Sequence, residues 1–208
     1  MTRSPVAGWT ACSPDAKLLA LRSVGRPVLV DIEARHELGP LETAPEGPGP
    51  LLFTRDSKAL ITAGSMDGTV RVCDLSTRRV RSVLAGHSAF VSALALSPDG
   101  KTLASGSVDT TVRLWRLGPG SSASVRILTG HGGAATALAF SPDGKVLAVG
   151  SYDGPIKLWN VPTGQEIGSL KGHLSIVVSL AFSPDGQMLA SASYDKTLRL
   201  WIAPKIAH

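Results

Sequence analysis

The feature that most constrains this chain is a repeat of about 43 residues that occurs three times in register. Residues 86–115, 130–159 and 172–201 align without a gap. Each begins with Gly-His, places the tetrapeptide SPDG ten residues after the His, an Asp 22 residues after it and a Trp 28 residues after it. Four landmarks held in one frame three times indicate a repeated structural unit, and such repeats decide the architecture before any local pattern does.

Two weaker copies precede the three sharp ones. Residues 53–74 match the second half of a unit, with Asp67 at the Asp position and Cys73 at the Trp position, but no Gly-His stands upstream. Residues 12–32 carry SPDA in place of SPDG, with Gly25 and Asp31 at the positions of the Asp and the Trp. The chain of 208 residues therefore reads as five units, three well defined and two degenerate.

Within a unit the apolar residues alternate with a period of two, which is typical of β-strands. The segment VSALAL (91–96) leads into SPDG, whose Pro and Asp-Gly favour a turn, and the β-branched segment TVRLW (111–115) follows another turn. We predict four short antiparallel strands per unit and no helices. A four-stranded sheet cannot bury its faces alone, so the units must stack radially, and we expect an all-β fold: a β-propeller of about five four-stranded blades.

The pattern Gly-His…SPDG…Asp…Trp at this period resembles the WD-repeat (WD40) family, and in particular its uniform bacterial repeat arrays. The Asp that commonly follows the Trp in that family is replaced here by Arg116, Asn160 and Ile202. The resemblance implies a buried hydrogen-bonded tetrad of His, Ser or Thr, Asp and Trp in each unit. Carried over, it comprises His87, Ser105, Asp109 and Trp115; His131, Asp153 and Trp159, with Val149 replacing the Ser; and His173, Ser191, Asp195 and Trp201. The second unit keeps only Asp67, with Ala63 and Cys73 beside it.

The recurring His and Asp also match the composition of a general base and the residue that orients it. An active site occurs once, whereas these residues recur in identical frames, so we expect them to be structural and the chain to have no catalytic residues. A hydrolase-type propeller remains an alternative, for which the non-repeating histidines are His36 and His208. No phosphate-binding glycine motif, HExxH or paired-cysteine motif is present, so neither a cofactor nor a metal is expected.

The formal net charge is +5, and nucleic-acid binding is therefore an alternative hypothesis, because clustered basic residues contact phosphates. The densest basic run is Arg71, Arg78, Arg79 and Arg81, and its alternative interpretation is a solvated strand and loop. Cys12 and Cys73 are read as reduced thiols of a cytoplasmic protein. No apolar run approaches the length of a membrane span, so no membrane association is expected.

A partner is expected to contact positions that vary between otherwise similar units. The resemblance implies docking at the entry to the first strand and at the turn before the Asp. The candidate protein-binding residues at these positions are Met66, Phe90, Tyr152, Ile176, Val178 and Tyr194. Exposed apolar and aromatic side chains of this kind favour a protein or peptide partner, and packing against neighbouring loops is the competing interpretation.

We expect a single domain over residues 1–208, with units at about 6–43, 44–85, 86–129, 130–171 and 172–208. The last unit ends after its third strand, and neither end of the sequence supplies a fourth. We therefore expect an open arc rather than a closed ring of five blades, completed by a second copy in a dimer or by the rest of a longer protein. Together these features predict a non-catalytic scaffold for protein–protein interactions.

Overall fold

The computed structural model describes residues 9–22, 25–41, 44–64, 67–118 and 124–202. These residues form five antiparallel sheets and contain no helix. The first sheet comprises β1 (Trp9–Cys12), β2 (Leu18–Arg22), β3 (Val28–Asp31) and β4 (His36–Pro40), and the second β5 (Leu51–Phe53), β6 (Ala59–Ala63), β7 (Val70–Asp74) and β8 (Arg79–Leu84). The third comprises β9 (Val91–Leu96), β10 (Thr102–Ser107), β11 (Val112–Arg116) and β12 (Ser124–Leu128), and the fourth β13 (Ala135–Phe140), β14 (Val146–Ser151), β15 (Ile156–Asn160) and β16 (Gln165–Leu170). The fifth has only β17 (Val177–Phe182), β18 (Met188–Ser193) and β19 (Leu198–Ile202).

Each sheet begins with a hairpin whose turn is the SPDG segment or its counterpart, SPDA in the first sheet and TRDS in the second. In the third sheet, Ser97 Oγ donates to Asp99 Oδ1 at 2.5 Å and accepts a hydrogen bond from the backbone N–H of Thr102 at 2.9 Å. Gly100 adopts the left-handed conformation, with φ +71°, that this turn requires. Ser13, Thr54, Ser141 and Ser183 make the equivalent hydrogen bond to the Asp two residues later, so the turns of all five sheets share this contact.

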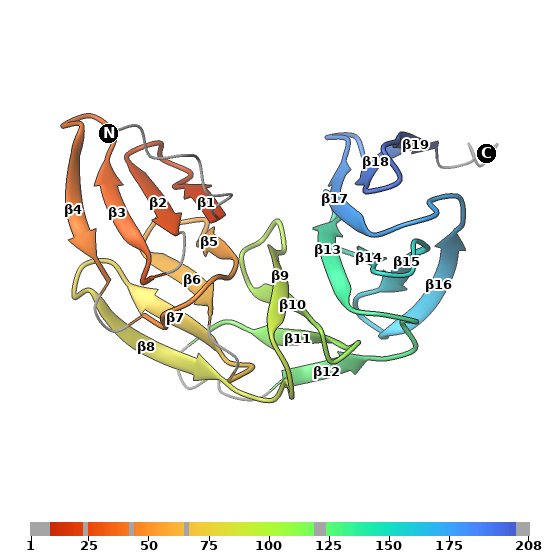
Figure 1. Ribbon diagram of the computed structural model, residues 1–208, viewed down its shortest axis with the longest axis horizontal. Coiled ribbons are helices and arrows are strands. Elements are labelled where there is room, and N and C mark those ends of the chain that lie inside the picture. The colour runs from red at the N-terminus through yellow and green to blue at the C-terminus, as the bar shows by residue number, and fades with distance from the viewer. Residues whose placement is uncertain (1–8, 23–24, 42–43, 65–66, 119–123, 203–208) are drawn as a thin grey trace.

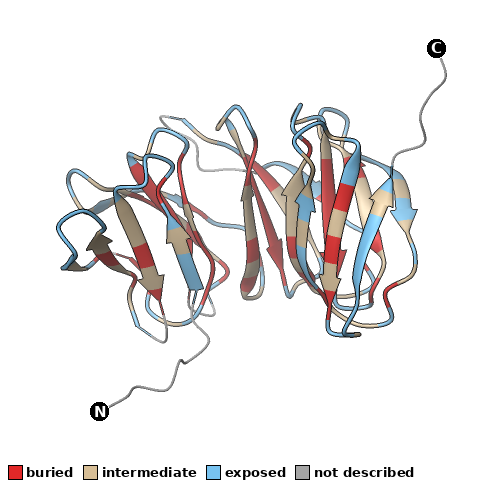
Figure 2. Cartoon of the chain, turned by 90° about the horizontal axis from the view of Figure 1, so that it is seen from above, coloured by how far each residue is buried: buried red, intermediate tan, exposed pale blue. Residues whose placement is uncertain are grey.

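The hydrophobic core lies between neighbouring sheets rather than inside any one of them. Four clusters of buried residues each join two consecutive sheets, and Figure 2 shows the buried residues on the strands that face one another. The sheets approach closely at Gly106 and Gly150, where an added Cβ would lie 2.9 Å from Ala135 and 2.6 Å from Val177 of the next sheet. Glycine at these positions therefore sets the spacing between the third, fourth and fifth sheets.

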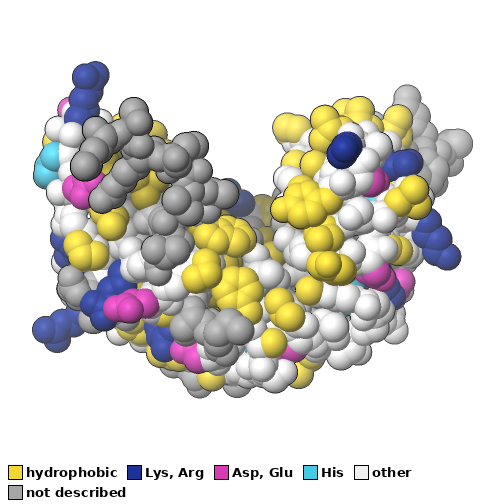
Figure 3. Space-filling view, viewed as in Figure 1, with side chains coloured by type: hydrophobic (Ala, Val, Ile, Leu, Met, Phe, Trp, Pro, Cys, Tyr) yellow, Lys and Arg dark blue, Asp and Glu magenta, His cyan; other side chains and the backbone are white. Residues whose placement is uncertain are grey.

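The five sheets are arranged radially in an arc, with β1, β5, β9, β13 and β17 along its inner margin (Figure 1). The arc is open between the first and fifth sheets, and the space-filling view in Figure 3 shows the same opening. The predicted fold class is thus confirmed: an all-β, open β-propeller of five sheets, the last of which has three strands among the described residues. No helix in the part of the chain that the structure describes could cross a membrane.

Candidate functional site

A continuous hydrogen-bond network crosses the third sheet from its surface turn to its core. His87, just before β9, places Nδ1 2.8 Å from Asp109 Oδ2 and Nε2 2.8 Å from Ser105 Oγ. Trp115 Nε1 donates to the same Ser105 Oγ at 2.8 Å. These contacts are all satisfied when His87 is neutral and carries its proton on Nδ1, because Ser105 then accepts from the indole and donates to Nε2. The four residues that the family resemblance implied for this unit therefore lie together in one network.

The turn between β10 and β11 holds the carboxylate of Asp109 in its ionised form. Besides His87, Asp109 accepts hydrogen bonds from the N–H of Ser88 at 3.0 Å, and from the N–H and hydroxyl of Thr111 at 2.9 and 2.7 Å. Burial raises the pKa of Asp109, but these donors outweigh burial and hold the pKa at about 2. Burial lowers the pKa of His87 more than its bond to Asp109 raises it, which favours the neutral ring.

The fifth sheet repeats the same geometry. His173 lies 2.8 Å from Asp195 and 2.7 Å from Ser191, and Trp201 Nε1 donates to Ser191 Oγ at 2.9 Å. The hydroxyl of Thr197 donates to Asp195 and lowers the pKa of this carboxyl, as Thr111 does in the third sheet. Both histidine side chains are fully buried, so neither ring is accessible to a substrate.

The fourth sheet does not form this network. Val149 occupies the position of the bridging serine, and neither ring nitrogen of His131 nor the indole N–H of Trp159 has a hydrogen-bond partner. The two rings lie closer together than in the other sheets, with centroids 5.5 Å apart. Asp153 accepts a hydrogen bond from Ser151 Oγ instead. His131, Asp153 and Trp159, which the family resemblance implied for this unit, are therefore not joined by hydrogen bonds.

Two substitutions explain why the fourth network is disconnected. Val149 offers no hydroxyl to join His131 to Trp159, and Pro155 replaces the threonine that holds the Asp in the other sheets, so its missing N–H frees Asp153 to turn toward Ser151. Burial, assisted by the nearby charge of Lys157, lowers the pKa of His131 to about 4. His131 is consequently a neutral, buried ring without a partner at physiological pH.

Replacing Val149 by serine is expected to reconnect the fourth network. The new hydroxyl would accept from Trp159 Nε1 and donate to His131 Nε2, as Ser105 does in the third sheet. Val149→Ala is the matched control, because it removes similar apolar volume and adds no hydroxyl. We expect the serine variant to exceed the alanine variant in free energy of unfolding by about 1–3 kcal/mol, measured by urea denaturation. Equal stabilities would contradict the assignment of Val149 as the break in the network.

The second sheet shows where the alignment of the sequence was wrong. The pairing of Leu60 with Cys73 corresponds to that of Leu103 with Trp115, so the position equivalent to Ser105 is Thr62 and not Ala63. Thr62 is fully buried, and its hydroxyl has no hydrogen-bond partner. The segment that leads to the Asp is one residue longer in the second unit, from Thr62 to Asp67, than in the third, from Ser105 to Asp109, and counting back from Asp67 could not reveal this.

The predicted partner-binding positions lie at one end of the sheets. In each of three sheets the residue before the turn Asp donates its N–H to the carbonyl at the entry of the first strand: Val108 to Phe90, Tyr152 to Ala134 and Tyr194 to Ile176, all at 2.9 Å. The side chains of Tyr152 and Tyr194 are 61% and 68% exposed. Phe90 and Ile176 are half-buried, Val178 is exposed, and Met66 lies outside the described residues. We call this end of the third to fifth sheets the rim.

The rim continues from one sheet to the next. A Cβ added at Gly154, in the turn after Tyr152, would lie 2.5 Å from the carbonyl oxygen of His173 in the following sheet. Leu174, directly after that histidine, is 89% exposed, although sequence reasoning did not select it. The available signal was its position, because Ser88 and Gly132 occupy it in the preceding units.

One candidate position has a structural role in two of the sheets. Ser92 Oγ donates to the carbonyl of Ala135, and Thr136 Oγ1 to that of Val177, each at 2.6 Å across the boundary to the next sheet. Val178 follows them in the fifth sheet and has no hydroxyl. This position therefore links sheets where a hydroxyl is present and stays free in the fifth sheet.

The basic run is partly occupied by contacts within the chain. Arg71 pairs with Asp67 at 2.9 Å, and Arg78 donates to the carbonyls of Leu38 and Gly39 in the first sheet at 2.7 and 3.0 Å. Arg79 and Arg81 are exposed on β8. Two of the four arginines thus join the second sheet to the first or close a turn rather than form a groove for phosphate.

The non-repeating histidines and the two cysteines do not form a catalytic or metal site among the described residues. His36 is exposed on β4, and His208 lies outside the described residues. The described residues contain no group of three or more His, Cys, Asp or Glu side chains that could hold a metal ion. Cys12 and Cys73 are both free thiols, and burial raises the pKa of Cys73 to about 11.

Comparison with known proteins agrees with the arrangement of the sheets. The family model described as "WD domain, G-beta repeat" matches residues 78–116, 122–160 and 164–201, which together are more than half of the chain. WD repeat-containing protein SL1-17 of Schistosoma mansoni is 34% identical over 113 residues, which cover 53% of this chain and 37% of that protein. Small ribosomal subunit protein RACK1y of Oryza sativa subsp. japonica is 45% identical over 60 residues, covering 29% and 18%. Set1 complex component swd2 of Schizosaccharomyces pombe is 41% identical over 66 residues, covering 31% and 18%.

The matches thus span less than two fifths of the length of these relatives. Repeated sheets with a common hairpin turn, the His–Ser–Asp–Trp network of the third and fifth sheets and the matching family model all agree. The chain belongs to the WD40 family.

Proposed function

We propose that this chain is a non-catalytic platform that binds other proteins through its rim. The observation that carries the proposal is the pair Tyr152 and Tyr194, two exposed aromatic side chains on turns fixed by backbone hydrogen bonds to the adjacent strand. Tyrosine combines a large contact area with a polar tip and loses little conformational entropy on binding. Leu174 and Val178 add exposed apolar surface in the fifth sheet.

The repeated polar residues support a structural rather than a catalytic role. A general base must reach the proton that it abstracts, whereas the side chains of His87 and His173 are fully buried and bonded at both ring nitrogens. Each Asp partner also accepts hydrogen bonds from the N–H of the residue after the His and from the N–H and hydroxyl of a threonine in its own turn. These histidines and aspartates are therefore assigned to the stability of each sheet.

The relatives support a role within larger assemblies. Two of them are named as a protein of the small ribosomal subunit and as a component of the Set1 complex, and we infer a comparable adaptor role in the cytoplasm for this chain. We treat residues 1–208 as one domain with the unit boundaries given above, completed by a second copy or by a longer parent chain. The likeness to bacterial arrays rests on the uniform SPDG units alone, since the three relatives named are eukaryotic.

The rim is tested by a double substitution with a matched control. Tyr152→Glu with Tyr194→Glu places two charges on the rim, whereas Val125→Glu with Ile167→Glu places two charges on the outer strands β12 and β16. Both proteins are first shown to be folded by circular dichroism. In affinity capture from nuclease-treated lysate, we expect the wild type and the Val125/Ile167 variant to retain the same proteins and the tyrosine variant to lose them. Equal capture by all three proteins would contradict the proposal that partners bind at the rim.

A further inference from the structure

The turn that carries Tyr152 on the rim is held differently from its counterparts. In the third and fifth sheets, the serine two residues before the turn Asp donates to a carbonyl of the loop that follows the His. These bonds join Ser107 Oγ to Ala89 at 3.2 Å and Ser193 Oγ to Ser175 at 3.0 Å. Ser151 donates instead to Asp153 and to the carbonyl of Pro155. The serine of the fourth turn therefore bonds within its own turn rather than to the loop.

The carboxylate of the fourth turn also has a different partner. In the third and fifth sheets, the turn Asp contacts Nδ1 of the His that stands 22 residues earlier, at 2.8 Å in both. Asp153 has the same separation from His131 but accepts from Ser151. Its Oδ2 lies beside Gly132, directly after the histidine, where an added Cβ would overlap it. One chain thus shows two arrangements of the same turn, with the Asp bound either to the His or to the serine.

Two glycines give the fourth turn room to change between these arrangements. Gly132 and Gly133 follow the His, where the third and fifth units have Ser-Ala and Leu-Ser. A Cβ added at Gly133 would lie 3.0 Å from the Cβ of Tyr152, so the tyrosine packs directly on this loop. Tyr152 is also the residue before Asp153 in the chain. A change of partner by Asp153 therefore reaches the exposed tyrosine.

His131 is the group that can draw Asp153 away from Ser151. Neither of its ring nitrogens has a hydrogen-bond partner. Three charged groups act on the ring: Lys157 from β15, Asp153 from the turn and Glu166 from β16. Lys157 and Glu166 form an ion pair with each other at 2.6 Å. Asp153 is therefore the carboxylate available to a protonated ring.

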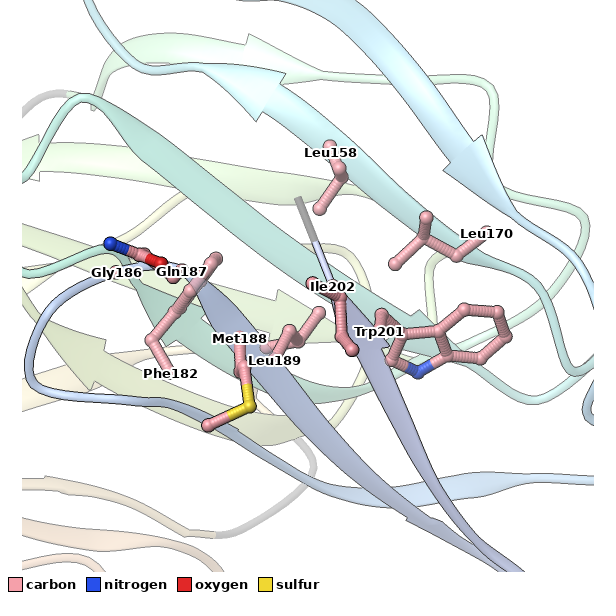
Figure 4. Close-up of a pocket in the computed structure, with 9 residues that line it drawn as sticks. All are labelled: Leu158, Leu170, Phe182, Gly186, Gln187, Met188, Leu189, Trp201 and Ile202. Atoms are coloured by element: carbon pink, nitrogen blue, oxygen red, sulfur yellow. The ribbon is translucent and has the colours of Figure 1, made fainter. Parts of the chain in front are cut away.

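Both neighbouring sheets face the fourth sheet with apolar side chains. On the third-sheet side, Trp159 packs in an apolar cluster with Leu114. On the fifth-sheet side, an apolar pocket of about 210 Å³ lies between Leu158 and Trp201 (Figure 4), and none of the described side chains that line it is ionisable. These surroundings strengthen the attraction between a protonated His131 and a carboxylate of its own sheet.

We propose that protonation of His131 transfers Asp153 from Ser151 to the histidine and moves the rim turn that carries Tyr152. The attraction between the two charges offsets part of the cost of burying the protonated ring. Ser151 is then free to donate to the carbonyl of Gly133, as its counterparts do in the third and fifth sheets. In its effect on partners this inference rests on the proposed function, because the displaced turn belongs to the rim. Partner binding at the rim is thereby coupled to pH.

The two tyrosines of the chain provide the test, because one lies on the turn that moves and the other on its counterpart. Fluorotyrosine gives each a resonance in fluorine NMR, assigned with Tyr152→Phe. Between pH 6.5 and about 4, we expect the Tyr152 resonance to shift with the same midpoint as the ring-carbon resonance of His131. Tyr194 is expected to stay constant, because His173 already contacts Asp195 at 2.8 Å. A constant Tyr152 resonance while His131 titrates would overturn the proposal.

Asp153→Asn separates movement of the turn from the electric field of the protonated ring. The amide carries no charge to be drawn to His131. We therefore expect the ring to titrate at a lower pH in this variant and the Tyr152 resonance to stay constant. A shift of Tyr152 that persists in Asp153→Asn would show a field effect alone and would overturn the proposal.

Gly132→Ala tests the same movement without acid. Its Cβ displaces Asp153 from its present place, so we expect the Tyr152 resonance at neutral pH to move toward the position that it takes in acid. Gly168→Ala on β16 is the matched control, because its added Cβ would lie 4.0 Å from its nearest neighbour, Leu158. An unchanged Tyr152 resonance in Gly132→Ala would contradict the coupling of Asp153 to the rim.

The effect on the rim is measured with the proteins that the wild type captures from lysate and the double tyrosine variant loses. We expect acidification to release these proteins from the wild type and not from His131→Leu. Equal release from both would contradict the regulatory role of His131. Because the NMR measurements use no partner, the movement of the turn and the binding function of the rim can each fail without the other.

Discussion

Replacing Trp115 by alanine is expected to lower the free energy of unfolding by about 3–5 kcal/mol, the usual cost of truncating a buried aromatic side chain. Trp115 is fully buried and packs in the cluster that joins the second and third sheets. The substitution also removes the indole N–H that donates a hydrogen bond to Ser105 Oγ. Urea denaturation followed by circular dichroism measures the effect.

Trp201→Ala is the matched control for Trp115. It removes the same hydrogen bond to serine, since Trp201 Nε1 donates to Ser191 Oγ at 2.9 Å, but Trp201 is partly exposed. The cost should therefore be smaller at position 201, because less apolar surface and less packing are lost. Equal costs at the two positions would show that the hydrogen bond, and not burial between sheets, dominates the contribution of these tryptophans.

Acidification from pH 6.5 to pH 4 is expected to destabilise the wild type by up to about 3 kcal/mol through His131 alone. Burial lowers the pKa of His131 from 6.5 to about 4, and each pKa unit corresponds to about 1.4 kcal/mol. A depressed folded-state pKa means that the unfolded chain takes up the proton first, so stability is complete above pH 6.5 and is lost as the pH falls toward 4. The carboxyl groups with lowered pKa, such as Asp109, lose their contribution to stability chiefly below this window, as the pH falls from the unfolded value of 3.8 toward the folded value of about 2.

His131→Leu is the variant that isolates this effect, because it keeps an apolar side chain and removes the titrating ring. We expect the stabilities of the two proteins, measured by urea denaturation at several pH values, to diverge below pH 6.5, with the variant the more stable at pH 4.5. His87 contributes with the same sign in both proteins, since burial lowers its pKa too, and so it cancels in the comparison. Parallel pH profiles would show that His131 is solvated or has a partner.

The sequence was sufficient to predict the structure wherever a residue type fixes the local backbone geometry. The SPDG tetrapeptide and its counterparts SPDA and TRDS specify a turn through contacts two to five residues apart, as between Ser97 and Asp99. The five sheets follow from the recurrence of this turn. The network of the third sheet was likewise accessible, because its four residue types repeat in one frame. Counting positions from one unit to the next failed at Thr62, because the turn that follows it is one residue longer than in the third unit.

Features that depend on contacts between units were not accessible from the sequence. Arg22 is buried between the first and second sheets, where its guanidinium donates to the carbonyls of Ala63 and Pro45 at 2.5 and 3.1 Å. Nothing local to Arg22 indicates those acceptors, which lie 41 and 23 residues away. In the same way, the sequence showed that Val149 breaks the repeat, but only the packing showed that His131 and Trp159 then close on each other without a partner.

The sequence by itself determined the repeated sheet, its turns and its family, because these depend on contacts within one unit of about 43 residues. The tertiary structure decided which of the repeated positions contact a neighbouring sheet and which face solvent. Ser92 and Thr136 donate hydrogen bonds to the next sheet, whereas the side chains of Tyr152, Tyr194 and Leu198 remain exposed. The physical reason is that exposure is a property of the neighbouring sheet rather than of the residue itself. Leu198 and Val112 occupy equivalent positions, and only the strand and sheet packed against Val112 bury it.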